Sequence, residues 1–121
     1  MTASEPTMIG LSERTHGLLK RLKEDEHFSE MQDAYRLGIA LALASGVSPE
    51  EPPTPRTTIF SVATIDPDRE LSVAIRALIE VGDIPIYKWA ERLAEWGVKE
   101  LALRAEAGDL DVAALIQEAR G

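Results

Sequence analysis

Few side chains of the kinds used in catalysis or metal binding occur in this chain of 121 residues. It has no cysteine, and its two histidines, His16 and His27, lack the spacing of a metal-binding motif. Asp66 and Asp68 place two carboxylates in one turn, where they could bind a cation or act as an acid/base pair. An Asp-Pro-Asp sequence before a helix is more typical of a turn with an N-cap. The sequence therefore predicts no catalytic residue, no metal and no cofactor.

Basic residues gathered near the N-terminus could contact phosphate groups. The candidate DNA-binding residues are Arg14, Lys20, Arg21 and Lys23. Acidic residues stand at both ends of the same segment, so a solvated helix face is the other interpretation. The formal net charge of −8 argues against a protein whose whole surface binds nucleic acid, because such binding depends on cation–phosphate attraction. Any phosphate-facing patch is therefore expected on the N-terminal half.

Composition and length indicate a single globular domain. The chain is 45% hydrophobic and 28% charged, which excludes wholesale disorder. No apolar run approaches the length of a membrane span, and the start of the chain does not resemble a signal peptide. We expect a flexible N-terminus over residues 1–7, a domain over residues 8–121, no membrane partner and a cytoplasmic location.

The periodicity of apolar residues predicts a mainly α protein. We expect a compact helical bundle of about five helices with one or two short extended segments. The helices are expected at 13–25, 30–45, 69–81, 85–107 and from 112 onward. Ser29 and Gln32 have the spacing of a capping box before the second helix, and Ser12 and Asp111 are expected to cap the first and last helices. The extended segments are expected at 7–12 and 57–65, and a proline-rich connector at 48–56.

The stretch "RLGIALALASG" from Arg36 to Gly46 predicts a helix that is apolar on every side. Such a helix must be covered all round, and a chain of this length can hardly enclose a central helix unaided. We therefore predict a self-association interface in which small residues let helices approach closely. Its predicted residues are Leu37, Gly38, Leu41 and Ala42. The alternative is a monomer in which this helix is the central core helix.

The order of these features resembles the small E subunit family of the bacterial DNA phosphorothioation (Dnd) machinery. The matching residues are Leu11-Ser12, Leu19, Leu22, and Arg36, Gly38, Leu41 and Leu43 within "RLGIALAL", followed downstream by "TIFSVATID" and "WGVKEL". The similarity extends over most of residues 8–116. It implies a compact, helical homo-oligomer of tetramer type with an accessory, non-catalytic role. It also implies binding to DNA, notably nicked duplex, through surface lysines.

The sequence therefore indicates two alternative functions. The first is a non-enzymatic, oligomeric accessory or scaffold protein of a bacterial DNA-modification or defence system, with other subunits of that system as partners and DNA contact open. The second is a ribbon-helix-helix-like transcription regulator or antitoxin, in which "TMIGLS" pairs with its twin and reads the major groove. Thr7, Met8 and Gly10 offer little for such reading. A small enzyme is a third, weaker interpretation.

Overall fold

The structure is mainly helical, as the sequence predicts. The computed structural model describes residues 5–120. Within these residues the elements are β1 (Met8–Ser12), α1 (Glu13–Glu24), α2 (Met31–Ser45), β2 (Arg56–Ser61), α3 (Val62–Ile65), α4 (Glu70–Leu78), α5 (Ile86–Glu106) and α6 (Val112–Arg120). The five predicted helices are all present within a few residues of their expected bounds, and a short sixth helix, α3, joins them.

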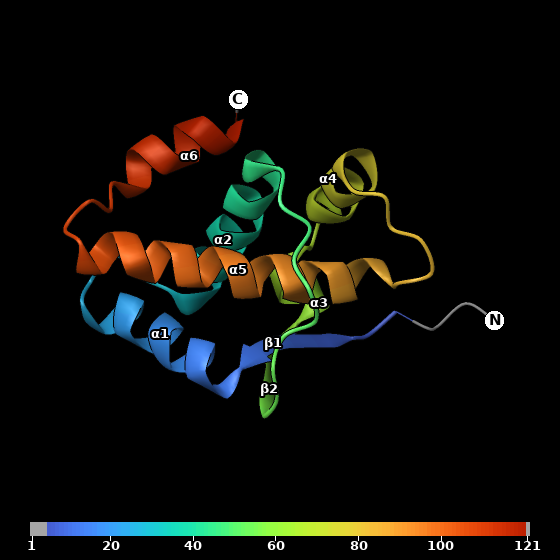
Figure 1. Ribbon diagram of the computed structural model, residues 1–121, viewed down its shortest axis with the longest axis horizontal. Helices are drawn as coiled ribbons and strands as arrows, with labels where there is room; N and C mark the ends of the chain where they lie inside the picture. The colour runs from blue at the N-terminus through green and yellow to red at the C-terminus, as the bar shows by residue number, and fades with distance from the viewer. Residues whose placement is uncertain (1–4, 121) are drawn as a thin grey trace.

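The long helix α5 forms the centre of the molecule (Figure 1). In this view α1 and β1 lie along one side of α5, α4 and α6 lie on the opposite side, and α2 crosses behind it. The most extensive contact between any two elements is that of α2 with α5. The core is therefore organised around one helix crossing, with the remaining elements attached to α5 or α2.

Helix starts follow the predicted capping residues in two cases and depart from them in one. The Ser12 hydroxyl accepts a hydrogen bond from the Thr15 backbone N–H at 3.2 Å, and the Asp111 carboxylate accepts one from the Ala114 N–H at 3.0 Å. The capping box predicted at Ser29 is wrong, because α2 begins later, with Glu30 in the capping position and no side-chain hydrogen bond there. Ser29 therefore precedes the cap by one residue.

The predicted extended segment at 57–65 divides into a strand and a helix. β2 ends at Ser61, whose hydroxyl accepts a hydrogen bond from the Thr64 N–H at 3.1 Å and so caps α3. β2 pairs with β1 in an antiparallel two-stranded sheet, in which Gly10 lies opposite Thr58 and Leu11 opposite Thr57. An irregularity interrupts the register between Ile9 and Gly10.

The apolar helix α2 is covered by its own chain. α5, α6, α1, α4 and α3 all contact it. Gly38 faces Gly97 of α5 so closely that a Cβ built on Gly97 would lie 1.9 Å from the Gly38 carbonyl oxygen. Two glycines at the crossing point bring the backbones together, and a single small domain thereby encloses its central helix.

The predicted interface on α2 is therefore corrected to a core contact. Leu37, Gly38, Leu41 and Ala42 are all buried within the single chain, and Leu37 and Leu41 keep only 8% and 5% of their surface exposed. The close helix approach inferred from Gly38 exists, but its partner is α5 of the same molecule. This arrangement is the alternative in which α2 serves as the central core helix.

The segments outside the helices are tied to the core by backbone groups. Residues 1–4 of the predicted flexible N-terminus lie outside the described residues, whereas the Thr7 carbonyl accepts a hydrogen bond from the Val62 N–H at 2.9 Å. The proline-rich connector 48–56 passes across α5 on its way to β2 (Figure 1). Its Pro52 is buried, and the Pro55 carbonyl accepts the Glu13 N–H at 2.9 Å.

Candidate functional site

Two buried carboxylates on α5 are the first candidates for chemistry that the fold presents. Glu91 and Glu95 are one helical turn apart and expose only 2% and 4% of their surface. A buried charge is costly unless other groups pair with it. Their surroundings therefore decide whether they belong to a reaction site or to the scaffold.

Glu91 joins three segments of the chain. One carboxylate oxygen accepts a hydrogen bond from the Gly10 backbone N–H at 2.9 Å. The other oxygen, Oε1, lies 2.5 Å from a guanidinium nitrogen of Arg56 and 3.1 Å from the ammonium nitrogen of Lys88. This single side chain therefore attaches both strands to α5.

Glu95 makes an equally complete set of contacts to the start of α1. Its Oε1 accepts the Ser12 backbone N–H at 2.9 Å. Its Oε2 accepts the Ser12 hydroxyl at 2.8 Å and the Thr15 hydroxyl at 2.6 Å, and lies 3.3 Å from the Lys99 ammonium. Burial by itself would raise the pKa of Glu95, but the hydrogen bonds from Thr15 and Ser12, together with Lys99, lower it below its ordinary value.

The arrangement of the carboxylate pair is that of a clamp. All four carboxylate oxygens accept hydrogen bonds or contact cations from within the chain. Tyr35 of α2 adds to the clamp by donating its hydroxyl to the Gly10 carbonyl at 2.9 Å, and burial raises the pKa of Tyr35 well above its ordinary value, with Glu91 adding to the rise. A general acid or base needs an oxygen that a substrate can reach, so this geometry supports a structural role.

These two glutamates are not among the candidate residues predicted from the sequence. The signal for them lies in "WAERLAEWG", where Glu91 and Glu95 share one helix face and apolar residues stand on either side of Glu95. Their partners come from Gly10, Ser12 and Thr15, which are about eighty positions away in the sequence. The pairing therefore appears only once β1 lies against α5.

Asp66 binds the start of α4 through its side chain, although Arg69 and not an aspartate of the predicted turn occupies the N-cap position. Its carboxylate accepts the Leu71 and Ser72 backbone N–H groups at 3.0 Å each, at the start of α4, and the Tyr87 hydroxyl at 2.9 Å. Burial and the hydrogen bond to Asp66 raise the pKa of Tyr87. Asp68 is exposed, so the two carboxylates of the turn do not converge as an acid/base pair.

The two histidines do not form part of a metal site. His16 is half-buried on α1. Burial lowers its pKa, and the positive charge of the neighbouring Lys20 lowers it further. His27 lines a cleft between the ends of α1 and α5. Across the described residues, no group of three or more histidine, cysteine, aspartate or glutamate side chains is arranged to hold a metal ion.

The predicted DNA-binding residues are all exposed on α1, but they do not converge on one point. Arg14 and Arg21 are seven residues apart, so they share one side of the helix, whereas Lys20 and Lys23 are neighbours on the rest of its exposed surface. Ion pairs between described residues involve Arg36, Arg56, Lys88, Lys99 and Arg104. None of the four cations on α1 is among them. The acids near them in sequence therefore do not neutralise them by direct contact.

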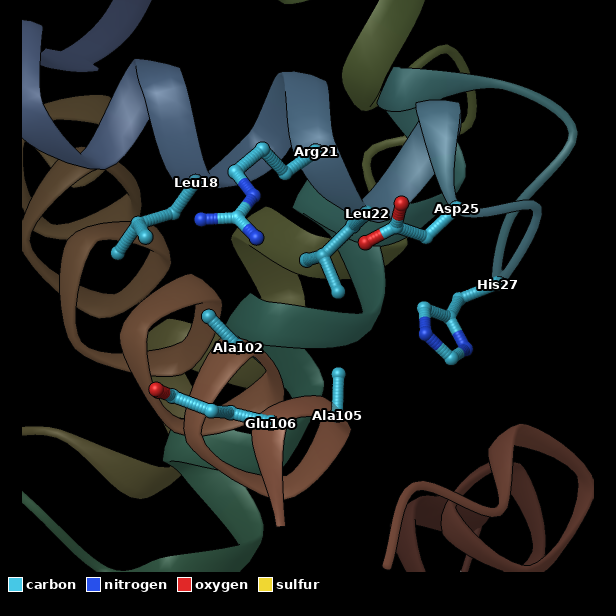
Figure 2. Close-up of a pocket in the computed structure, with 8 residues that line it drawn as sticks. All are labelled: Leu18, Arg21, Leu22, Asp25, His27, Ala102, Ala105 and Glu106. Carbon is cyan, nitrogen blue, oxygen red and sulfur yellow. The ribbon is translucent and has the colours of Figure 1, made fainter. Parts of the chain in front are cut away.

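Two of these cations border clefts between α1 and α5. Arg21 lies above a cleft of about 110 Å³, with Asp25 and Glu106 also in its lining (Figure 2). Arg14 lines a neighbouring cleft with Lys99, which the sequence did not link to the cluster. The first cleft has one cation against the acids Asp25 and Glu106. The second also contains Glu106 but has two cations, of which Lys99 pairs with Glu95, so the Arg14 side is the more favourable one for an anion.

The strand β1 has no edge left for pairing with a twin. One of its edges is occupied by β2, and the Gly10 and Ser12 N–H groups on the other edge are bound by Glu91 and Glu95. A ribbon-helix-helix regulator needs this strand to be available for a second copy. The geometry therefore gives that alternative no support.

No helix among residues 5–120 combines the length and apolar character needed to cross a membrane. Comparison of the chain with family models, with curated proteins and with solved structures finds no match. The resemblance to the Dnd E subunit family accordingly stays a prediction.

Proposed function

We propose that this chain is a non-enzymatic accessory or scaffold protein of a bacterial DNA-modification or defence system, acting as a homo-oligomer and contacting DNA through α1. The observation that carries the proposal is the set of exposed cations on α1, none of which is ion-paired among the described residues. The choice of a DNA-modification or defence system depends on the resemblance of residues 8–116 to the Dnd E subunit family.

A non-catalytic role is supported by how the polar groups of the interior are used. Glu91 and Glu95 bind backbone and side-chain donors of β1 and α1, and Asp66 binds the start of α4. The most deeply buried carboxylates therefore stabilise the scaffold. The exposed cations are left as the groups available to a partner.

The location of the cations also fits the strongly negative net charge of the protein. A net charge of −8 repels DNA from most of the surface, so binding must be confined to a limited patch. Arg14 of α1 and Lys99 of α5 border the same cleft and would extend the α1 patch toward α5. Such a patch favours a weak, strongly salt-dependent contact with phosphates.

The test is fluorescence anisotropy of labelled intact and nicked duplexes at low and near-physiological salt. We expect binding with a steep salt dependence, and Arg14→Gln, Lys20→Gln and Lys23→Gln should each reduce the salt slope by about one. Arg76→Gln is the matched control, because Arg76 is an exposed cation on α4. Absence of binding at low salt, or equal effects of Arg76→Gln and the α1 variants, would overturn DNA contact through α1.

A further inference from the structure

The outer edge of β2 is an open strand edge. Gly10 and Ser12 of β1 direct their N–H groups to Glu91 and Glu95, away from β2. In an antiparallel pair, two residues directly opposite each other either both direct their N–H and C=O groups toward the other strand or both direct them away from it. Thr58 and Arg56, which lie opposite Gly10 and Ser12, therefore direct their N–H and C=O groups away from β1.

The middle of this edge is uncovered in the described part of the chain. Thr57 and Thr58 are exposed, and no hydrogen bond of residues 5–120 engages the outward backbone groups of Thr58. In Figure 1, β2 lies at the lower margin of the molecule with no other element beyond it. Backbone donors and acceptors in a row of this kind are a template for another strand.

Most of the strand lacks the features that usually protect such an edge. Proteins discourage pairing at an exposed strand with charged residues or proline. Pro55 precedes β2 and its first residue, Arg56, is charged but bound by Glu91. The following residues include neither a charge nor a proline, and three of the five are β-branched: Thr57, Thr58, Ile59, Phe60 and Ser61. No acidic residue occurs between Glu51 and Asp66, so this segment adds no negative charge to the repulsion expected between two chains of net charge −8.

The strand is also held in place before any partner arrives. The Arg56 guanidinium is bound by Glu91 at one end, and the Phe60 ring packs edge-on against Tyr35 of α2 with 5.1 Å between ring centroids. An edge fixed at both ends loses little conformational entropy on pairing. A two-stranded sheet is by itself marginal, and further strands would stabilise it.

We propose that β2 pairs antiparallel with β2 of a second copy, centred on Thr58, to form a continuous four-stranded sheet across the dimer. A strand that pairs with itself about a twofold axis places Thr58 opposite its own copy, a favourable cross-strand pair. The other edge of each sheet is blocked by Glu91 and Glu95, so the assembly stops at two chains through this contact. The proposal gives the self-association in the proposed function a specific surface.

The experiment is sedimentation equilibrium of the full chain with Thr58→Lys and Thr58→Pro. The native chain should show twice the 13.3 kDa mass of one chain, and both variants should show the mass of a single chain. Proline at an outward-facing edge position removes no bond of the β1–β2 ladder, so the fold is retained and far-UV circular dichroism should be unchanged. Ala77→Lys, on the exposed side of α4, is the matched control and should stay dimeric.

A cross-link provides the second measurement. The chain contains no cysteine, so Thr58→Cys should give a single disulfide-linked dimer on oxidation, whereas Ala77→Cys should stay monomeric on a denaturing gel. A native chain of single-chain mass at all concentrations, or a Thr58→Lys variant that keeps the native dimer mass, overturns the proposal. These results are obtained without DNA, so they are independent of whether the cations of α1 bind a duplex.

Discussion

On one side of α5, Gly97 meets Gly38 of α2 with no room for a methyl group, whereas on another side Glu91 and Glu95 bind β1 and α1 through buried hydrogen bonds. The first contact is steric and apolar, so it depends on side-chain volume and hardly on pH or salt. The second depends on complete pairing and on the ionised state of the carboxylates. One helix therefore organises the domain by two means that should fail under different perturbations.

The largest expected effect comes from adding a methyl group at the crossing of α2 and α5. Gly97→Ala should destabilise the protein by about 3 kcal/mol or more, because overpacking outweighs the ~1 kcal/mol that alanine gains over glycine in helix propensity. The added Cβ would lie 1.9 Å from the Gly38 carbonyl oxygen. Urea unfolding followed by circular dichroism measures the loss. Gly38→Ala is the matched control with a smaller loss, because its Cβ would lie 3.0 Å from its nearest neighbour, the Val98 nitrogen. A Gly97→Ala protein as stable as the native chain would contradict the steric account.

Removing the carboxylate of Glu95 should be the next most damaging change. Glu95→Ala leaves the Ser12 N–H, the Ser12 hydroxyl and the Thr15 hydroxyl without their buried acceptor, at a cost of about 2–4 kcal/mol. The same urea titration serves as the measurement. Glu100→Ala is the control, because Glu100 pairs with Arg104 nearer the surface and should change stability by less than about 1 kcal/mol. Equal losses in the two variants would mean that the clamp contributes little.

Lowering the pH should affect the two contacts of α5 differently. The folded-state pKa of Glu95 is lowered, so its contribution to stability is present above its ordinary pKa of 4.5 and is lost as pH falls through the lowered value. Unfolding free energies measured from pH 7 down to pH 3 should therefore fall less steeply for Glu95→Gln than for the native chain. Gly38→Ala should keep the native pH dependence, because no ionisable group is altered. Parallel curves for Glu95→Gln and the native chain would refute the role of this carboxylate.

The smallest expected effect concerns the hydrogen bond that links the two sides. Tyr35 belongs to α2 but donates its hydroxyl to the Gly10 carbonyl of β1 at 2.9 Å. Tyr35→Phe removes this bond while keeping the ring contact with Phe60, so a loss of about 1 kcal/mol is expected. Thermal unfolding provides the measurement. A loss as large as that of Glu95→Ala would place Tyr35 at the centre of the clamp.

Local sequence signals were sufficient for most of the secondary structure. The helix caps at Ser12 and Asp111 and the turn at Asp66 depend on side chains that bond backbone groups a few residues away, and all three are present. The capping box at Ser29 failed, because the helix begins one residue further on. The strand at 7–12 was expected, but its partner was not, since strand pairing joins segments that are distant in sequence.

The candidate site was less predictable than the fold. Exposure of Arg14, Lys20, Arg21 and Lys23 follows from their positions on an amphipathic helix, and the structure agrees. The approach of Lys99 to Arg14, in contrast, requires α1 and α5 to pack together. The buried pair at Glu91 and Glu95 was missed for the same reason, because glutamates on a mixed helix are ordinarily exposed.

The sequence by itself determined a mainly helical single domain, the bounds of its helices to within a few residues and an apolar α2 that had to be covered on every side. Only the tertiary structure decided what covers it. The sequence pattern around Gly38 is equally compatible with a helix of a second copy and with a helix of the same chain. The facing glycine, Gly97, lies on α5 of the same chain. Periodicity is a local property that the chain carries in its order of residues, whereas the choice of partner depends on contacts between distant segments, which exist only after folding.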